Sequence, residues 1–153
     1  MVSLQENKSS ESDINALLAK EGVKSTKHRK AILELLENSD IPLTADEIFL
    51  ALKENNTSIW LSTVYRTLEM LTEKEVVIKS TLMGEDKARY EIKHDEHKHR
   101  FVCIGCHKMI PLLDCPLKEF EQKLKTKMDF DVMGHNLEIY GYCRDCKHRG
   151  PQK

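Results

Sequence analysis

Two pairs of cysteines constrain this chain more than any other feature of its sequence. Cys103 and Cys106 form one CxxC pair, and Cys143 and Cys146 form the other. Each pair places two sulfur atoms on one tight turn, which is the ligand spacing of a structural, tetrahedral zinc site. Because the pairs lie far apart in the sequence, the ion would join distant segments into a small domain. The alternatives are two disulfides, which would need an oxidising compartment, or unrelated buried thiols.

Length and composition narrow the class of protein. The chain has 153 residues, of which 40% are hydrophobic and 32% are charged, and its formal net charge is −1. This length suits one ordinary domain or two very small ones, and the bulk charge gives no support for nucleic-acid binding. No apolar run is long enough to span a membrane, and the N-terminus lacks the apolar core of a signal peptide. We therefore expect a cytoplasmic protein with no membrane partner.

The chemistry of the chain changes near His94. Only His28 among the seven histidines precedes this position, and all five cysteines follow it. The N-terminal half instead shows a series of helical patterns. Their apolar stripes are Ile14, Leu17 and Leu18, then Ile32, Leu35 and Leu36, then Ile48, Phe49 and Leu52, and last Val64, Leu68 and Leu71. We therefore predict a first domain at residues 1–93, a hinge at 94–96 and a metal-binding dimerisation domain at 97–153, within an α+β fold.

The N-terminal half predicts a winged helix-turn-helix domain. Thr44 and Glu47 form a capping box, in which each side chain satisfies a free backbone donor of the other residue. Predicted helices begin near Ser12, Thr26, Thr44 and Ser62, with Thr26 and Ser62 as N-caps. Predicted strands at 76–78 and 88–92 flank a turn at 83–87. In a winged helix, one helix enters the major groove and the hairpin lies over the neighbouring backbone. The alternative is a plain helical bundle.

The helix near Ser62 is the candidate for the major groove. Its early positions carry short hydroxyls, a phenol and a guanidinium, which can reach phosphates and base edges, and we expect Thr67 to be exposed with them. A cluster of basic residues at positions 20–30 is a second candidate for phosphate contact. The candidate DNA-contacting residues are Lys24, Thr26, Arg29, Ser62, Thr63, Tyr65 and Arg66.

The C-terminal half predicts a small α/β unit. Strands are expected at 100–104 and 108–113, and one strand or a pair of strands at 130–140. A helix is expected to begin at Asp114-Cys115-Pro116, because proline is favoured at the first helical position. Its buried stripe would be Leu117, Phe120 and Leu124. Small domains of this kind often pair across a two-fold axis, so we expect a homodimer that reads a palindromic DNA site.

A second metal site is predicted from the remaining histidines and the fifth cysteine. His97, His99, Cys115 and His135 would make a complete tetrahedral set of three nitrogens and one sulfur, which suits zinc or cobalt. Taken singly, His135 and Cys115 also fit ordinary packing residues. Glu119 is the substitute ligand for Cys115, and Asp114 is a weaker one. Glu91 and His94 are candidates for an additional site at the hinge.

Taken together, several segments resemble the ferric uptake regulator family of bacterial metal-sensing repressors. The resemblance spans about residues 12–146 and rests on Thr26-x-x-Arg29, Thr44-Ala45-x-Glu47-Ile48, Leu61 to Leu68, Tyr90-Glu91-Ile92, His97-x-His99, and Gly134-His135 with Tyr140 to Cys146. It implies a homodimer with an N-terminal winged helix and a zinc-bearing dimerisation domain. It also implies a sensory metal that closes the dimer on DNA, operator contacts by Tyr65 and Arg66, and a place by the hinge for Glu91.

This chain departs from the family pattern at its metal ligands. Pro42, Lys98, Arg100 and Pro111 stand where many members have hinge-site ligands, so the usual hinge site is in doubt. At the other sensory site the usual carboxylate position falls on Lys118. Cys115 or Glu119 must replace that ligand, or water must. A cysteine would shift the preference from iron toward zinc because thiolate is a soft ligand, with Fe²⁺ or Mn²⁺ as the other candidates.

We therefore expect a metal-sensing, DNA-binding transcriptional repressor of metal-uptake or metal-homeostasis genes. Its ligands would be a double-stranded operator and divalent metal ions. An iron-dependent peroxide sensor of the same family is the first alternative. A zinc hydrolase is a second, but the sequence has no HExxH motif. A zinc-ribbon protein that binds another protein and not DNA is a third.

Overall fold

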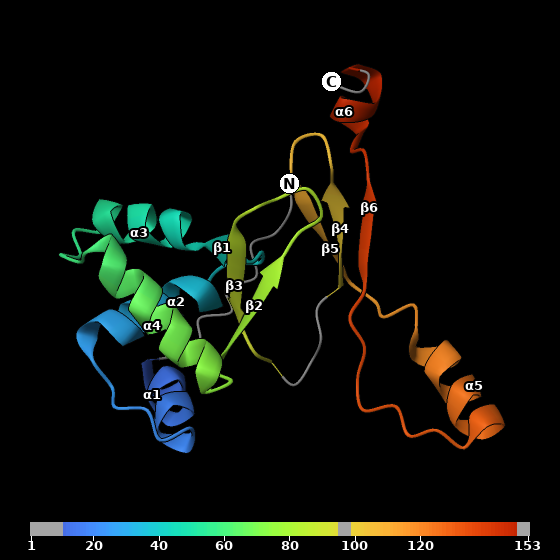
Figure 1. Cartoon of the computed structure of the whole chain (residues 1–153), viewed down its shortest axis with the longest axis horizontal. Helices are drawn as coiled ribbons and strands as arrows, with labels where there is room; N and C mark the ends of the chain where they lie inside the picture. Colours follow the sequence, from blue (N-terminus) through green and yellow to red (C-terminus); the bar gives the residue numbers. More distant parts are fainter. Residues whose placement is uncertain (1–10, 95–98, 150–153) are drawn as a thin grey trace. The chain divides into compact units, whose positions relative to one another are not determined.

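The computed structural model describes residues 11–94 and 99–149. The chain divides into two compact units, residues 1–93 and 94–153, each traced in Figure 1. Each unit is built around its own three-stranded sheet. Within the described ranges, no helix is both long enough and apolar enough to cross a membrane.

The N-terminal unit combines helices with a small antiparallel sheet. Along the chain its elements are α1 (Glu11–Lys20), α2 (Lys27–Glu37), β1 (Leu43–Thr44), α3 (Ala45–Glu54), α4 (Leu61–Glu73), β2 (Val77–Thr81) and β3 (Ala88–Ile92). The strands lie in the order β1-β3-β2, and both pairings are antiparallel. This is the predicted succession of helices and a hairpin, with the addition of the short strand β1. Strand β1 was not predicted, because two residues are too few to show an alternating pattern.

Local capping set the starts of two helices as predicted. The Thr26 side chain accepts a hydrogen bond from the Arg29 backbone N–H at 3.3 Å, and Thr44 and Glu47 form the complete capping box of α3. The prediction that Ser62 caps α4 is wrong. Trp60 is the N-cap, without a side-chain hydrogen bond, and Ser62 lies inside the helix. Ile59 and Val64, at the positions of a hydrophobic staple, both belong to the buried core, and this packing fixes the helix start.

The core of this unit lies between the helices and the sheet. Most of the predicted apolar stripes are buried, including Ile32, Leu52 and Leu68. Leu33 is also fully buried, whereas the predicted Leu35 is only partly so. The prediction that Thr67 is exposed is wrong, since its exposed fraction is 8%. Thr67 occupies the inward face of α4, together with Val64, Leu68 and Leu71.

A buried arginine joins the hairpin to α3. Arg89 on β3 donates two hydrogen bonds to Glu85, at 2.7 and 3.1 Å. It also donates to the Pro42 carbonyl and to the Glu47 carboxylate, each at 3.2 Å. Glu47 belongs to the capping box and Glu85 to the hairpin turn. The guanidinium therefore holds the β2–β3 hairpin, which is the wing of the winged helix, against the start of α3.

The C-terminal unit is a sheet with two helices. Its elements are β4 (His99–Cys103), β5 (Met109–Leu112), α5 (Lys118–Met128), β6 (Glu138–Gly141) and α6 (Arg144–Arg149). The strands lie in the order β5-β4-β6, with β4 antiparallel to β5 and parallel to β6. The strands at 100–104 and 108–113 are confirmed with small shifts of their ends. The prediction of strand at 130–140 is wrong for most of its length, because only β6 forms.

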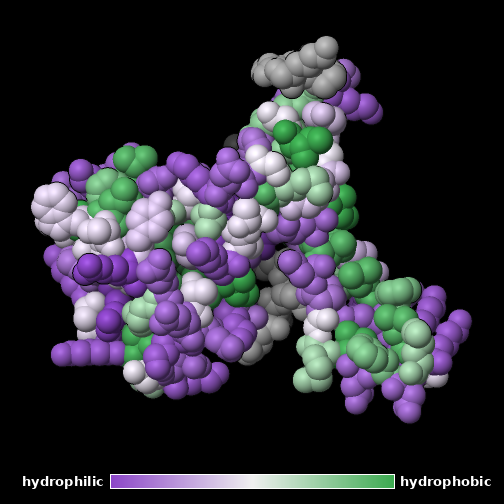
Figure 2. Space-filling model, in the orientation of Figure 1, coloured by the Kyte–Doolittle hydropathy of each residue, from purple (hydrophilic) through white to green (hydrophobic). Residues whose placement is uncertain are grey.

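The buried stripe predicted for the helix after Cys115 is also wrong. The helix begins at Lys118, two residues after Pro116, and has no buried residue; Phe120 is 56% exposed. No element of the described residues buries this face of α5. Figure 2 shows apolar residues gathered on the surface around α5 and along the sheet. Helix α6 was not predicted.

Candidate metal centres and nucleic-acid interface

The four cysteines of the CxxC pairs meet at one end of the C-terminal sheet. Their sulfur atoms all lie within 4.8 Å of one another. Cys103 ends β4, and it is paired in register with Gly141 at the end of the parallel strand β6. Because the ends of neighbouring parallel strands lie at the same sheet edge, the turn after each strand presents its own pair of thiols to the same point. Strand pairing therefore explains how distant cysteines form one cluster.

Hydrogen bonds hold the backbone around the cluster in place. The Cys103 N–H donates to the Lys108 carbonyl at 2.9 Å, and the His107 N–H donates to the Cys103 carbonyl at 2.8 Å. Gly105 lies close to the second pair: a Cβ added there would lie 3.1 Å from both Cβ and Sγ of Cys146. The glycine therefore lets the two turns approach each other closely.

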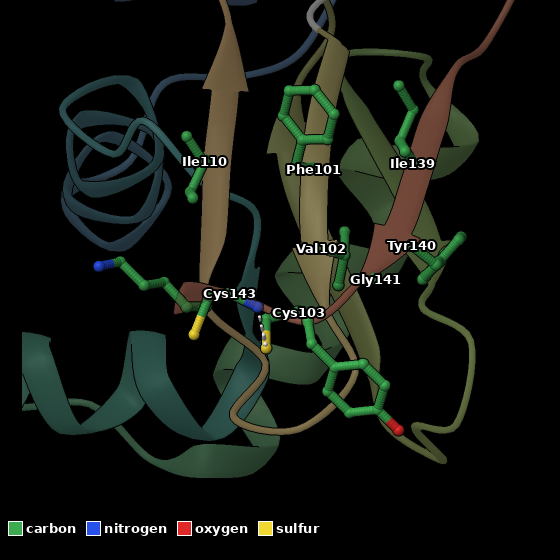
Figure 3. Close-up of a pocket in the computed structure, with 10 residues that line it drawn as sticks. Phe101, Val102, Cys103, Ile110, Ile139, Tyr140, Gly141 and Cys143 are labelled. Carbon is green, nitrogen blue, oxygen red and sulfur yellow. Dashed lines mark hydrogen bonds between the residues drawn. The ribbon is translucent and has the colours of Figure 1, made fainter. Parts of the chain in front are cut away.

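The thiols differ in their acidity. The Cys143 backbone N–H donates to Cys103 Sγ at 3.2 Å, as the dashed line in Figure 3 shows. This contact lowers the pKa of the Cys103 thiol to about 6. Hydrogen bonding with Cys106 and Cys143 raises the pKa of the Cys146 thiol to about 12. A metal that binds here must displace protons, so its affinity increases with pH.

The donor set fits zinc. All five cysteines of the chain are unpaired thiols, so the structure contains neither disulfide of the alternative interpretation. Cys106 Sγ and Cys143 Sγ are 3.7 Å apart. With Zn–S bonds of about 2.3 Å, a regular tetrahedron has sulfur–sulfur edges of about 3.8 Å, which agrees with this separation.

A second cluster joins residues from three parts of the C-terminal unit. His99 Nε2 lies 3.3 Å from Cys115 Sγ, which lies 3.2 Å from His135 Nε2. The two Nε2 atoms are 2.8 Å apart, and the imidazole rings stack with centroids separated by 4.7 Å. His99 begins β4, Cys115 precedes α5 and His135 precedes β6. Two imidazoles and a thiol at these separations can bind one ion of borderline softness.

Glu121 on α5 lies beside this cluster and was not predicted. Its Oε1 contacts His135 Nδ1, the ring nitrogen that does not face the other ligands. A carboxylate only accepts hydrogen bonds, so Nδ1 carries the hydrogen and donates it. Sequence spacing gave no direct signal for this pair. A search for an acidic partner to each predicted histidine ligand would have included it, because metal-bound histidines usually donate their other N–H.

The other predicted ligands do not join either cluster. His97 lies outside the described residues. Glu119 and Asp114 are exposed, and among the described residues the second cluster consists of His99, Cys115 and His135. Glu91 at the end of the hairpin is partly buried and His94 is exposed.

The predicted DNA-contacting residues lie in two regions of the N-terminal unit. Ser62, Tyr65 and Arg66 are exposed on the first turns of α4, and Thr63 is partly buried there. Lys24 and Thr26 are exposed before α2. The partly buried Arg29 donates a hydrogen bond to the Lys24 carbonyl at 2.6 Å.

One hydrogen bond connects these two regions. His28 Nε2 donates to the Ser58 carbonyl at 3.0 Å, joining the first turn of α2 to the segment that precedes α4. The basic start of α2 is thereby held beside the segment that leads into α4.

Comparisons with known proteins agree with this architecture. The model of the ferric uptake regulator family matches residues 20–140. The chain is 36% identical over 135 residues to a peroxide-responsive repressor, PerR, of Staphylococcus epidermidis, covering 88% of this chain and 89% of the relative. It is 33% identical over 136 residues to a ferric uptake regulation protein of Campylobacter upsaliensis, covering 87% and 86%.

A solved structure gives the same result for the fold. The Vibrio cholerae ferric uptake regulator superimposes with a TM-score of 0.72 at 28% identity, covering 84% of this chain and 98% of that one. A winged helix followed by a small unit with four clustered thiols defines a metal-responsive DNA-binding protein. The chain belongs to the ferric uptake regulator family of metal-sensing transcriptional repressors.

Proposed function

We propose that this protein represses metal-uptake or metal-homeostasis genes, in the cytoplasm, when a divalent metal occupies the second cluster. The observation that carries the proposal is the convergence of His99, Cys115 and His135, from three separate segments, within ligand distance of one another. His97 is the fourth proposed ligand. The protein has no proposed catalytic activity, and the metal acts by changing the affinity for operator DNA.

The chemistry of the donors favours zinc at this regulatory site. A thiolate beside neutral imidazoles prefers a borderline-soft ion to the harder Fe²⁺ or Mn²⁺. The four-cysteine cluster has a different role in the proposal. It binds zinc permanently and stabilises the C-terminal unit, whose buried apolar residues are few: Val102, Cys103 and Met109 among those described.

The surface of the C-terminal sheet supports the proposed homodimer. Phe101 is paired in register with Ile110 on one side and Ile139 on the other. Figure 3 shows the three side chains on one face of the sheet, and each is 38–44% exposed. An apolar row of this kind favours burial against a second copy. Two copies would present two α4 helices to a palindromic operator.

In this mechanism metal and DNA bind with positive coupling. Metal must bind the DNA-competent arrangement of the dimer better than the other arrangement, and such coupling is typically about 1–3 kcal/mol. His99 follows the hairpin closely in the sequence, so fixing it constrains the connection between the two units. Tyr65 and Arg66 are the proposed base and phosphate contacts on α4, with Lys24, Thr26, Arg29, Ser62 and Thr63 around them.

The test removes the regulatory site and leaves the structural site intact. We expect His99→Ala to keep the cysteine-bound zinc but to lose the zinc-dependent gain in affinity for a duplex selected from a random DNA pool. A gel shift across a zinc titration measures this gain. His148→Ala, which changes an exposed histidine on α6, is the matched control. Zinc-dependent binding that is the same in the His99 variant and in the wild type would refute the proposed regulatory role.

The peroxide-sensing alternative is retained because one relative of 36% identity is a peroxide-responsive repressor. In that case ferrous iron in the second cluster would react with peroxide and oxidise a ligand histidine. Mass spectrometry after treatment with ferrous iron and peroxide decides between the two. An added oxygen on His97 or His99 supports the alternative, and unmodified histidines with zinc-dependent DNA binding support the zinc sensor.

A further inference from the structure

We propose that Glu121 is a positioning residue of the regulatory metal site. This inference rests on the proposed function, because it assigns a role to a side chain that supports a ligand of that site. Glu121 would not bind the metal. It would hold the His135 ring so that Nε2 presents its lone pair to the ion.

The geometry separates the two nitrogens of His135 by role. Nε2 is the atom that faces Cys115 Sγ at 3.2 Å and His99 Nε2 at 2.8 Å. Nδ1 contacts Glu121 Oε1 instead. These nitrogens lie on different edges of the imidazole, so the carboxylate at Nδ1 lies on the side of the ring away from the other cluster atoms. Glu121 is therefore placed as a partner of the ligand and not as a ligand.

The contact also fixes which tautomer is present. Neutral imidazole carries one hydrogen, and the acceptor on Nδ1 keeps that hydrogen there. Nε2 is then unprotonated, as metal coordination requires. The His99 ring stacks on the His135 ring with an angle of 17° between the planes, which restrains tilting. Glu121 restrains the remaining rotation within the ring plane.

The surroundings make this hydrogen bond effective. The His135 side chain is 12% exposed and the Glu121 side chain is 23% exposed, so water competes little for either group. Charge supports the same role. Once a metal displaces the Cys115 proton, the sulfur and the Glu121 carboxylate would together carry two negative charges, which balance a divalent cation. The contact also connects α5, which has no buried residue, to the cluster.

The experiment compares metal affinity in two Glu121 variants and one matched control. Co²⁺ and Zn²⁺ affinities of the exchangeable site are measured by competition with a chelator, using full-length protein that retains its cysteine-bound zinc. We expect Glu121→Ala to weaken binding about 10–100-fold, the usual effect of losing such a partner. Glu121→Gln keeps an acceptor without the charge and should fall between Glu121→Ala and the wild type. Glu119→Gln, an exposed carboxylate on the same helix, should leave affinity unchanged.

The cobalt spectrum separates a positioning residue from a ligand. At saturating Co²⁺ the sulfur-to-cobalt absorption and the tetrahedral bands should persist in both Glu121 variants, because every proposed ligand remains. Unchanged affinity in Glu121→Ala would overturn the inference, and so would a change in the coordination bands. If His135→Ala loses the exchangeable metal while Glu121→Ala retains wild-type affinity, only this inference fails. A wild-type protein without an exchangeable metal would overturn the proposed function as well.

Discussion

At the scale of single residues, Cys115 sets the chemical character of the proposed regulatory site. The other members of the described cluster are imidazoles, which accept many divalent metals. The thiol lies 3.3 Å from His99 Nε2 and 3.2 Å from His135 Nε2. The sequence alone left Cys115 and Glu119 as alternatives, and only the fold places Cys115 in contact with both rings.

We expect Cys115→Ser to weaken zinc binding at this site, because serine replaces an anionic soft donor with a neutral hydroxyl. Loss of a side chain that only hydrogen-bonds to a ligand lowers metal affinity ~10–100-fold, and loss of a ligand itself should cost at least as much. The preference for zinc over Mn²⁺ should fall in parallel. Chelator competition with each metal measures both effects. Zinc at the four-cysteine cluster should remain at one ion per chain, and equal zinc affinities in the variant and the wild type would exclude Cys115 as a ligand.

At the scale of elements, α4 and the wing form the proposed DNA-reading surface. The inward face of α4 was largely predictable, because Val64, Leu68 and Leu71 repeat at helical spacing. The start of α4 was not predictable, because serine is a residue type that favours the N-cap, whereas Trp60 occupies that position. Trp60 is 80% exposed and is the one tryptophan of the chain.

Trp60 therefore provides a direct report on the position of α4. If the start of α4 enters the major groove, the indole should move from water to the DNA surface. We expect its fluorescence to change on addition of a duplex that the protein binds in the presence of zinc. The DNA concentration at the midpoint of this change should equal that at the midpoint of the gel shift. Trp60→Phe should show no such change in emission. Constant wild-type emission at a DNA concentration that saturates the gel shift would place another element in the groove.

At the scale of the whole molecule, the two units depend on different sources of stability. The N-terminal unit has an apolar core that includes residues from all four of its helices. The C-terminal unit leaves Phe101, Ile110 and Phe120 exposed and instead gathers four thiols around one point. In the proposed function, zinc binding would therefore supply a large part of the folding energy of the second unit.

Loss of one thiol of the four-cysteine cluster should make the two units unfold independently. We expect Cys103→Ser to lose the tightly bound zinc, to unfold the C-terminal unit and to dissociate the dimer, while the N-terminal helices remain. Zinc content, circular dichroism and sedimentation measure the three effects. Cys115→Ser is the control that keeps this zinc. A Cys103→Ser protein with one tight zinc and an unchanged melting curve would contradict the structural role.

The sequence by itself determined the features that depend on neighbouring residues. These are the capping box at Thr44 and Glu47, the apolar stripes of the N-terminal helices and the two CxxC turns. Such features form through hydrogen bonds and side-chain spacing within a few residues, so the sequence contains them directly. Tertiary structure decided the rest: the pairing of β4 with β6 that brings four thiols together, and the contact of Glu121 with His135. These depend on contacts between residues far apart in the chain, which local spacing does not specify.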